Sequence, residues 1–253
     1  MAGFAIDLHR RSMPAYVELA PPARLAETVE CLWVMHHEED SAARHRVLPD
    51  GCADILFTTG SAKPTLQVVG AMTRFEDYRV LPGQTMVGLR FHPGMWAHHI
   101  GIPADQVTDG LVALEDLWGP RARSLLQQLA ESTSPERCAG LLAGCLRNAS
   151  SPTALQRALA WMRLHRGVVS LDVLAGQCGI SPRQFRRLCL EQAGLSPKLL
   201  ARIVRFRYAL SRIHDEIGQH AGLAADCGYF DQSHFIADFQ RFSGHTPAAF
   251  SAR

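Results

Sequence analysis

The sequence lacks the features of a membrane protein, of a secreted disulfide-stabilised domain and of several common enzyme classes. It has no run of about eighteen apolar residues, so no transmembrane helix is predicted. The 7 cysteines are odd in number and scattered, and no Cys-x-x-Cys pair occurs, which favours buried thiols in a reducing cytoplasm over a disulfide framework. The amino-terminal residues contain no long apolar core and no cleavage site, so we expect no signal peptide.

Motifs of nucleotide-binding and hydrolytic enzymes are also absent. The sequence contains no P-loop, no dinucleotide-binding glycine fingerprint and no nucleophile elbow. The N-terminal half holds several residues of the types that bind metals, but no two stand at a zinc-binding spacing. These residues are His36, His37, His45, Asp50, Cys52, His92, His98 and His99. We therefore expect no catalytic residue, no cofactor and no bound metal, and we interpret Cys52 as a buried thiol rather than a redox sensor.

The charge of the chain is unevenly distributed. The 253 residues carry a formal net charge of only +2, and their length suggests one large or two ordinary domains. Residues 151–253 contain 13 Lys and Arg against 7 Asp and Glu, whereas residues 1–150 contain 13 against 17. A basic C-terminal part beside an acidic N-terminal part indicates that only the C-terminal part meets a polyanion.

The C-terminal part contains an internal repeat. The stretch LAGQCGISPRQFRRLCLEQAGLSP (174–197) aligns with LAADCGYFDQSHFIADFQRFSGHTP (223–247), and the second copy has one extra residue in its turn. Each copy predicts a short helix, a glycine turn, a polar N-cap and a second helix, which is the helix-turn-helix motif. We place the two units at about residues 170–193 and 219–243.

The second copy and its continuation, GYFDQSHFIADFQRFSGHTPAAF, resemble the DNA-binding domain of the AraC/XylS family of bacterial transcription regulators. Both units, a linking helix and the closing TPAAF are present in residues 154–253. The resemblance implies a cytoplasmic, sequence-specific regulator of transcription that binds double-stranded DNA. A small-molecule effector and RNA polymerase are further candidate partners, and the protein is expected to be a monomer or a homodimer without membrane contact.

The N-terminal part predicts a different fold. Residues 1–23 are polar and proline-rich and suggest an extended arm, and residues 44–91 contain short β-branched and aromatic runs separated by Pro or Gly. Helical patterns follow after residue 91, so we predict an α+β protein. Its parts are a β-rich domain at 1–148 (a small barrel or sandwich, cupin-like), a linker at 149–153 within the polar stretch RNASSPT (147–153), and an all-α domain at 154–253.

Three stretches of this N-terminal part, HRVLPDGCADILF, VGLRFHPG and TDGLVALEDLWG, resemble the sensor-like domain on one branch of AraC-type regulators. Aromatic and arginine side chains of this domain could line a ligand pocket, although aromatic residues at strand spacing more often belong to the core. The candidate pocket residues are Trp33, Arg46, Arg90 and Trp96.

The helices of the repeat indicate which residues contact DNA. In the first unit Arg side chains can bind guanine and Gln can bind adenine, and the linking helix carries a basic stripe. The second unit presents polar residues in the first turn of its second helix, and the N-cap serines place helix N-termini where phosphates can bind. The candidates are Arg183, Gln184, Arg186 and Arg187; Gln232, Ser233, His234 and Arg241; Lys198, Arg202 and Arg205; and Ser170, Ser181 and Ser196.

Two alternatives to an effector-responsive regulator remain open. One is a metal- or ligand-dependent enzyme of cupin-like fold with a DNA-binding tail, which a stoichiometric bound metal would favour. The other is a constitutive dimeric DNA-binding protein whose N-terminal domain only dimerises. A thermal shift with small metabolites separates it from a sensor, because a ligand that binds the native state raises apparent stability.

Overall fold

The computed structural model describes residues 15–37, 42–60, 63–147, 151–214 and 220–252. Within these residues the N-terminal domain has eight strands in two antiparallel sheets. Six strands form one sheet in the order β1-β2-β7-β4-β5-β8, and β3 and β6 form the other. The strands are β1 Ala15–Leu19, β2 Val29–His36, β3 Ala43–Val47, β4 Ala53–Thr59, β5 Thr65–Val69, β6 Glu76–Val80, β7 Thr85–Phe91 and β8 Leu111–Ala113.

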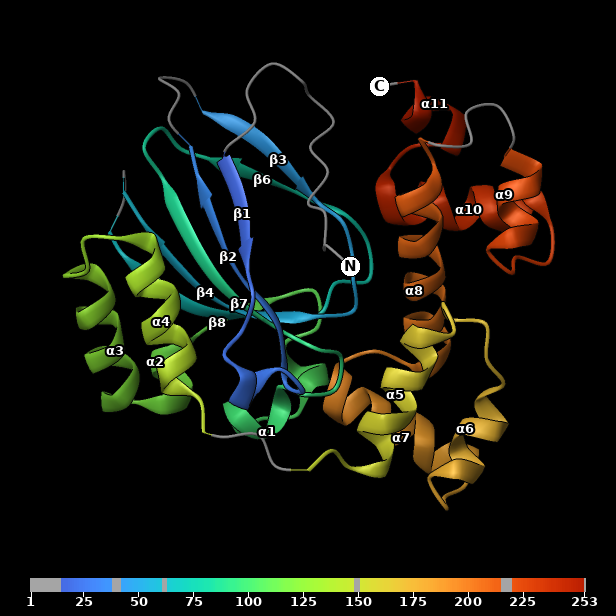
Figure 1. Ribbon diagram of the computed structural model, residues 1–253, viewed down its shortest axis with the longest axis horizontal. Coiled ribbons are helices and arrows are strands. Elements are labelled where there is room, and N and C mark those ends of the chain that lie inside the picture. The colour runs from blue at the N-terminus through green and yellow to red at the C-terminus, as the bar shows by residue number, and fades with distance from the viewer. Residues whose placement is uncertain (1–14, 38–41, 61–62, 148–150, 215–219, 253) are drawn as a thin grey trace.

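The six-stranded sheet is covered on both faces. Helices pack on one face (Figure 1), where side chains such as Leu89 and Leu142 are fully buried. The two-stranded sheet adjoins the other face, where Trp33 and Met35 of β2 share a cluster with Val80 of β6. The helices are η1 Ala23–Leu25, α1 Ala97–Ile100, η2 Ala104–Gln106, α2 Leu114–Trp118, α3 Pro120–Ala130 and α4 Pro135–Cys145. Alternation of apolar residues along β2 therefore serves two cores, one on each face.

The regular secondary structure of the C-terminal domain consists of helices in its described residues and follows the repeat. The helix α8 connects the unit α6–α7 to the unit α9–α10 (Figure 1). Its 16 residues span about 24 Å. The helices are α5 Ala154–Leu164, α6 Leu171–Gln177, α7 Pro182–Ala193, α8 Pro197–Arg212, α9 His220–Asp226, α10 Gln232–Ser243 and α11 Pro247–Ser251. Phe206 of α8 is fully buried against Phe239 and Phe242 of α10, with ring centroids 5.3 Å apart in each pair.

The predicted α+β class, with a β-rich domain followed by a double helix-turn-helix domain, is confirmed. The extended arm expected at 1–23 needs a correction, because residues 15–19 pair with β2 as an edge strand. Residues 1–14 of the arm and 148–150 of the linker lie outside the described residues. No described helix is long and apolar enough to cross a membrane.

Candidate functional site

The second helix of the first unit, α7, exposes a basic face. Its first turn is fixed by a capping box in which the Ser181 hydroxyl accepts a hydrogen bond from the Gln184 amide and the Gln184 side-chain oxygen accepts from the Ser181 amide. Arg183, Arg186 and Arg187 are exposed above a buried core face. The structure therefore exposes all four predicted residues of this helix, and the side-chain oxygen of one of them, Gln184, is engaged in the cap.

The second helix of the second unit, α10, exposes a polar first turn. Asp231 caps the helix by accepting a hydrogen bond from the His234 amide at 2.7 Å. Gln232, Ser233 and His234 are exposed, and Arg241 is exposed about two turns after His234 on the same face of the helix. This face holds fewer cations than α7, so hydrogen bonding is the chemistry it can offer to a ligand.

Of the three basic residues of α8 predicted to contact DNA, one is exposed to solvent and two contact other parts of the protein. Lys198 is exposed, but the Arg202 guanidinium forms an ion pair with the Asp238 carboxylate of α10, which is only 4% exposed. The Arg205 side chain donates to the Gly167 carbonyl at 3.1 Å and stacks over the Tyr229 ring at 5.2 Å. Arg202 and Arg205, both predicted to contact DNA, thus hold α8 against the second unit and against the loop that follows α5.

The N-terminal domain contacts the C-terminal end of each of the two recognition helices. The helix α7 ends at Gly194 in the left-handed conformation (φ +75°), and the Thr108 hydroxyl donates to the Gly194 carbonyl at 2.7 Å. A side chain at Gly194 would come within 2.7 Å of that hydroxyl oxygen and 3.1 Å of the Ala104 carbonyl oxygen. Because the last carbonyls of a helix lack intrahelical partners, Thr108 acts as a C-terminal cap supplied by the other domain.

The equivalent end of α10 is capped by Arg46 of β3. One Arg46 nitrogen donates to the Ser243 carbonyl at 3.1 Å and to His245 Nε2 at 3.0 Å. The other nitrogens bind both oxygens of Asp77 at 2.6 and 2.7 Å, and the guanidinium stacks over Phe75 at 4.2 Å. A cation at a helix C-terminus also interacts favourably with the helix dipole. The structure thus places Arg46, one of the predicted pocket residues, at the C-terminal end of α10.

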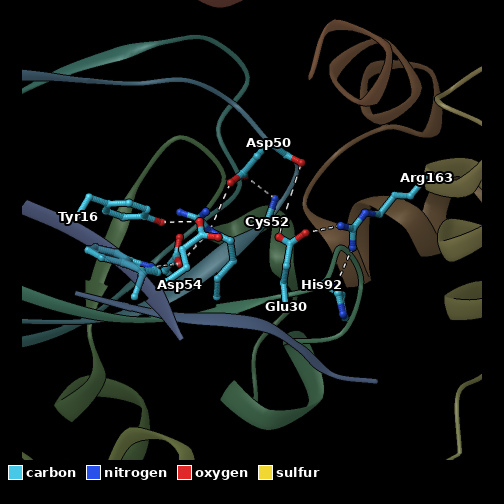
Figure 2. A network of polar contacts seen from close by, with 10 residues as sticks. Tyr16, Glu30, Asp50, Cys52, Asp54, His92 and Arg163 are labelled. Atoms are coloured by element: carbon cyan, nitrogen blue, oxygen red, sulfur yellow. Dashed lines mark hydrogen bonds and ion pairs between the residues drawn. The ribbon is translucent and has the colours of Figure 1, made fainter. Parts of the chain in front are cut away.

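A network of polar contacts connects the β-rich domain to α5 (Figure 2). Asp54 accepts a hydrogen bond from Trp33 at 2.9 Å and lies 3.3 Å from Arg90, which also pairs with Asp50. Burial raises the pKa of the Asp54 carboxyl to about 6, and the Arg90 guanidinium opposes that rise. Of the predicted pocket residues, Trp33 and Arg90 both contact Asp54. Trp96 is instead buried in the core on the other face of the sheet.

The network continues from Cys52 to α5 (Figure 2). The Cys52 thiol donates to Glu30 at 3.3 Å, Glu30 pairs with Arg163 of α5, and Arg163 contacts His92 Nδ1 at 2.5 Å. Burial raises the pKa of Cys52 well above its ordinary value, so the thiol stays protonated and can donate this hydrogen bond. Burial and the adjacent Arg163 lower the pKa of His92, so its imidazole is neutral and can accept from the guanidinium.

A cavity of about 790 Å³ lies where the network reaches α5. Its N-terminal wall carries acidic groups, and its C-terminal wall carries arginines and apolar side chains of α5 and α8. The lining includes Glu27, Glu30, Asp50, His92 and Met95 on one side, and Gln156, Arg157, Ala160, Arg163, Leu164, Arg166, Val204, Arg207 and Tyr208 on the other. The volume suits a small organic molecule, and the polar groups at one end could orient it.

Two domain matches cover most of the chain. Residues 17–113 match a domain of unknown function, DUF6597, and residues 174–253 match a helix-turn-helix domain. The C-terminal domain is an AraC-type helix-turn-helix domain. The predicted resemblance of this part of the chain is therefore confirmed, and the chain is a DNA-binding transcription regulator.

Two solved structures are among those to which the chain is similar. The C-terminal domain of AraT, a response regulator from Geobacillus stearothermophilus, is 21% identical over 41% of this chain and 88% of its own, with a TM-score of 0.37. ToxT from Vibrio cholerae is 10% identical over 88% of this chain and 96% of its own, with a TM-score of 0.43. No curated protein matches the chain significantly.

Sequence reasoning missed the contacts between the AraC-type domain and the N-terminal domain. Neither the caps from Thr108 and Arg46 nor the cavity leaves a local signal, because the residues that meet are distant in the sequence. Glycine at positions 194 and 244 was a partial signal, since a shared glycine in both repeats marks helix ends that tolerate close approach. Among the described residues, no group of three or more His, Cys, Asp or Glu could hold a metal ion.

Proposed function

We propose that this regulator binds two successive major grooves with the N-terminal halves of α7 and α10, and that a small molecule in the interdomain cavity alters that binding. The observation that carries the proposal is an asymmetry within each recognition helix. The N-terminal half of each is exposed, while the C-terminal end of each is held by the N-terminal domain. The second helix of a helix-turn-helix unit contacts bases in the major groove with its N-terminal residues. The exposed N-terminal halves are therefore available for DNA, and the held C-terminal ends give the N-terminal domain a contact through which it can change DNA binding.

The two units divide the recognition between charge and hydrogen bonds in this proposal. Arg183, Arg186 and Arg187 supply most of the phosphate and guanine contacts of the first unit, with help from Lys198. The second unit reads its half-site with Gln232, Ser233 and His234 and reaches a phosphate with Arg241. The backbone amides of helices capped by Ser170, Ser181 and Ser196 add neutral phosphate contacts.

A salt titration tests this division. Arg187→Ala should weaken binding to the preferred DNA site by about 1–3 kcal/mol and reduce the slope of log K against log salt by about one phosphate contact. Gln232→Ala should change base preference in the other half-site and leave the slope nearly unchanged. Arg123→Ala is the matched control, because Arg123 is also exposed and also paired with a glutamate, Glu115, but lies in α3. Equal slope changes in Arg187→Ala and Gln232→Ala would refute the division.

The polar network ends at the interdomain cavity, where a bound small molecule could reach the charged groups of the network. Glu30 and Arg163 line the cavity and form the ion pair that connects the two domains beside it. A bound molecule that competes for either charge would break this pair and loosen α5 from the N-terminal domain. We propose a monomeric chain as the DNA-binding unit, since α8 links two reading helices within one chain, and RNA polymerase as a further partner.

Filling the cavity tests the effector site. Ala160 is exposed to the cavity on α5, so Ala160→Trp should occupy part of the volume without disturbing the buried core. A screen of small metabolites should find compounds that raise the melting temperature of the wild type, and Ala160→Trp should abolish the shift while DNA binding persists. A shift of equal size in both proteins would place the effector elsewhere.

A further inference from the structure

Phe230 is a large apolar residue that nothing in the described chain covers. It lies in the turn of the second unit, directly before the N-cap residue Asp231, and its side chain is 92% exposed. The aromatic residues on either side of it in sequence, Tyr229 and Phe235, are 7% and 0% exposed. Leaving a whole phenylalanine side chain in water forgoes the favourable free energy of burial, so a partner that covers it would gain that free energy.

The repeat shows that Phe230 is the extra residue of the second turn. In the first unit the Ile180 amide donates to the Ala175 carbonyl at 3.1 Å, and in the second the Tyr229 amide donates to the Ala224 carbonyl at 3.0 Å. Ile180 and Tyr229 are therefore equivalent positions. The next residue of the first unit is already the N-cap, whereas in the second unit one residue stands between.

The insertion also explains why Phe230 points away from the protein. A hydrophobic residue before an N-cap commonly packs against the fourth residue of the helix, which in α10 is Phe235. Tyr229 already occupies that place, with its ring centroid 5.2 Å from that of Phe235. Phe230 is therefore free of the staple contact that Ile180 is positioned to make in the first unit, where it packs against the buried cluster.

We propose that Phe230 is a specificity residue that contacts a thymine methyl group at the edge of the second half-site. It extends the same end of α10 that exposes Gln232, Ser233 and His234, and recognition helices enter the major groove by this end. Phenylalanine is one of the side chains that make apolar contact with the thymine methyl group. A second protein would need a wider apolar surface, whereas the neighbours of Phe230 at this helix end are polar. The inference rests on DNA binding by the second unit.

A comparison of thymine with uracil tests the contact directly. The preferred site is first selected from random duplexes with the wild-type chain. Each thymine of the second half-site is then replaced singly by uracil, which removes only the methyl group. At one position the replacement should weaken wild-type binding about fourfold, the ratio that corresponds to burial of one methyl group. Phe230→Ala should bind the thymine site more weakly by a similar factor and should not distinguish thymine from uracil there.

The control is Leu111→Ala, which truncates a side chain 54% exposed on β8 and should keep the full thymine preference. Melting curves should coincide for all three proteins, because neither truncation removes a buried group. The inference is overturned if Phe230→Ala still distinguishes thymine from uracil at every position where the wild type does. It is also overturned if Phe230→Ala changes the sedimentation coefficient of the protein, which would indicate a protein partner surface, while its DNA preference stays as in the wild type. A wild-type chain that selects no site overturns the proposed function instead.

Discussion

At the scale of single residues, the Arg202–Asp238 pair fixes the second unit to α8. The Asp238 carboxylate is buried, and the Arg202 side chain is 32% exposed, so removal of either leaves a poorly solvated charge. We expect Asp238→Ala to lower the free energy of unfolding by about 2–4 kcal/mol and Arg202→Ala by a similar amount. A double-mutant cycle in urea should give a coupling free energy above 1 kcal/mol. If Arg202 instead met phosphate, Arg202→Ala would change the salt slope of DNA binding, which we expect to be unaltered.

His99 gives the protein a pH dependence of stability. Burial lowers its pKa from 6.5 to about 4, with His98 adding to the effect, and its Nε2 is buried without a hydrogen-bond partner among the described residues. Because the unfolded chain binds the proton more tightly, stability present above pH 6.5 is lost as the pH falls toward 4. We expect a loss of about 1–2 kcal/mol after allowance for solvent screening. His99→Phe should reduce this loss, as measured by urea unfolding at pH 7.5 and 4.5. An equal loss in both proteins would contradict the assignment.

Sequence patterns predict which side chains are exposed better than they predict their partners. Periodicity places Arg183, Arg186 and Arg187 on the solvent side of α7, because the buried positions of a helix recur every three or four residues. The same rule gives Arg202 a place in a basic stripe but cannot reveal Asp238, which lies 36 residues away. Long charged side chains reach partners that only the tertiary structure brings close.

At the scale of elements, caps and glycines made the C-terminal domain predictable. Ser170, Ser181, Ser196 and Asp231 each accept a hydrogen bond from a backbone amide of the helix that they precede, as the sequence indicates. The strand β1 was harder to predict, because its five residues pair with a neighbour on one side only and follow a polar stretch that reads as an extended arm. The two-stranded sheet was equally hidden, since pairing of β3 with β6 depends on a register that no local pattern specifies.

The glycine ends of helices α6 and α7 allow a matched comparison. Gly179 and Gly194 both have positive φ, but a side chain at Gly179 would meet no atom within 4 Å, whereas one at Gly194 would meet Thr108. Gly179→Ala should therefore cost about 1–2 kcal/mol from backbone strain alone. Gly194→Ala should cost more, because it also displaces the interdomain cap, and thermal unfolding of the two variants should rank them in that order. Equal losses would mean that the domains separate there without a penalty.

At the scale of the whole molecule, the N-terminal domain holds equivalent points of two repeated units. Thr108 caps α7 and Arg46 caps α10, while α8 between them is itself contacted by the N-terminal domain, since a side chain at Gly51 would lie 2.5 Å from Leu200 Cδ1. Three contacts along one face restrict both the separation and the relative rotation of the recognition helices. Sequence alone cannot reveal such a clamp, because each contact joins residues far apart in the chain.

The clamp predicts that spacing between half-sites, rather than base preference within them, depends on Arg46. In Arg46→Ala the C-terminal end of α10 loses a charged cap worth about 0.3–1 kcal/mol, and the second unit gains freedom to rotate about α8. Wild-type protein should bind a site of one spacing and discriminate against the same half-sites separated by one more base pair. Arg46→Ala should discriminate about two- to fivefold less, in proportion to the free energy of the lost cap. Arg79→Ala is the control, because Arg79 is exposed on the neighbouring strand β6. Electrophoretic mobility shifts with DNA of each spacing give the ratio of the two binding affinities for each protein. If Arg46→Ala and Arg79→Ala discriminate equally between the two spacings, these interdomain contacts do not set the spacing. An effector that acts through the same contacts should lower the ratio of the affinities for the two spacings in the wild type.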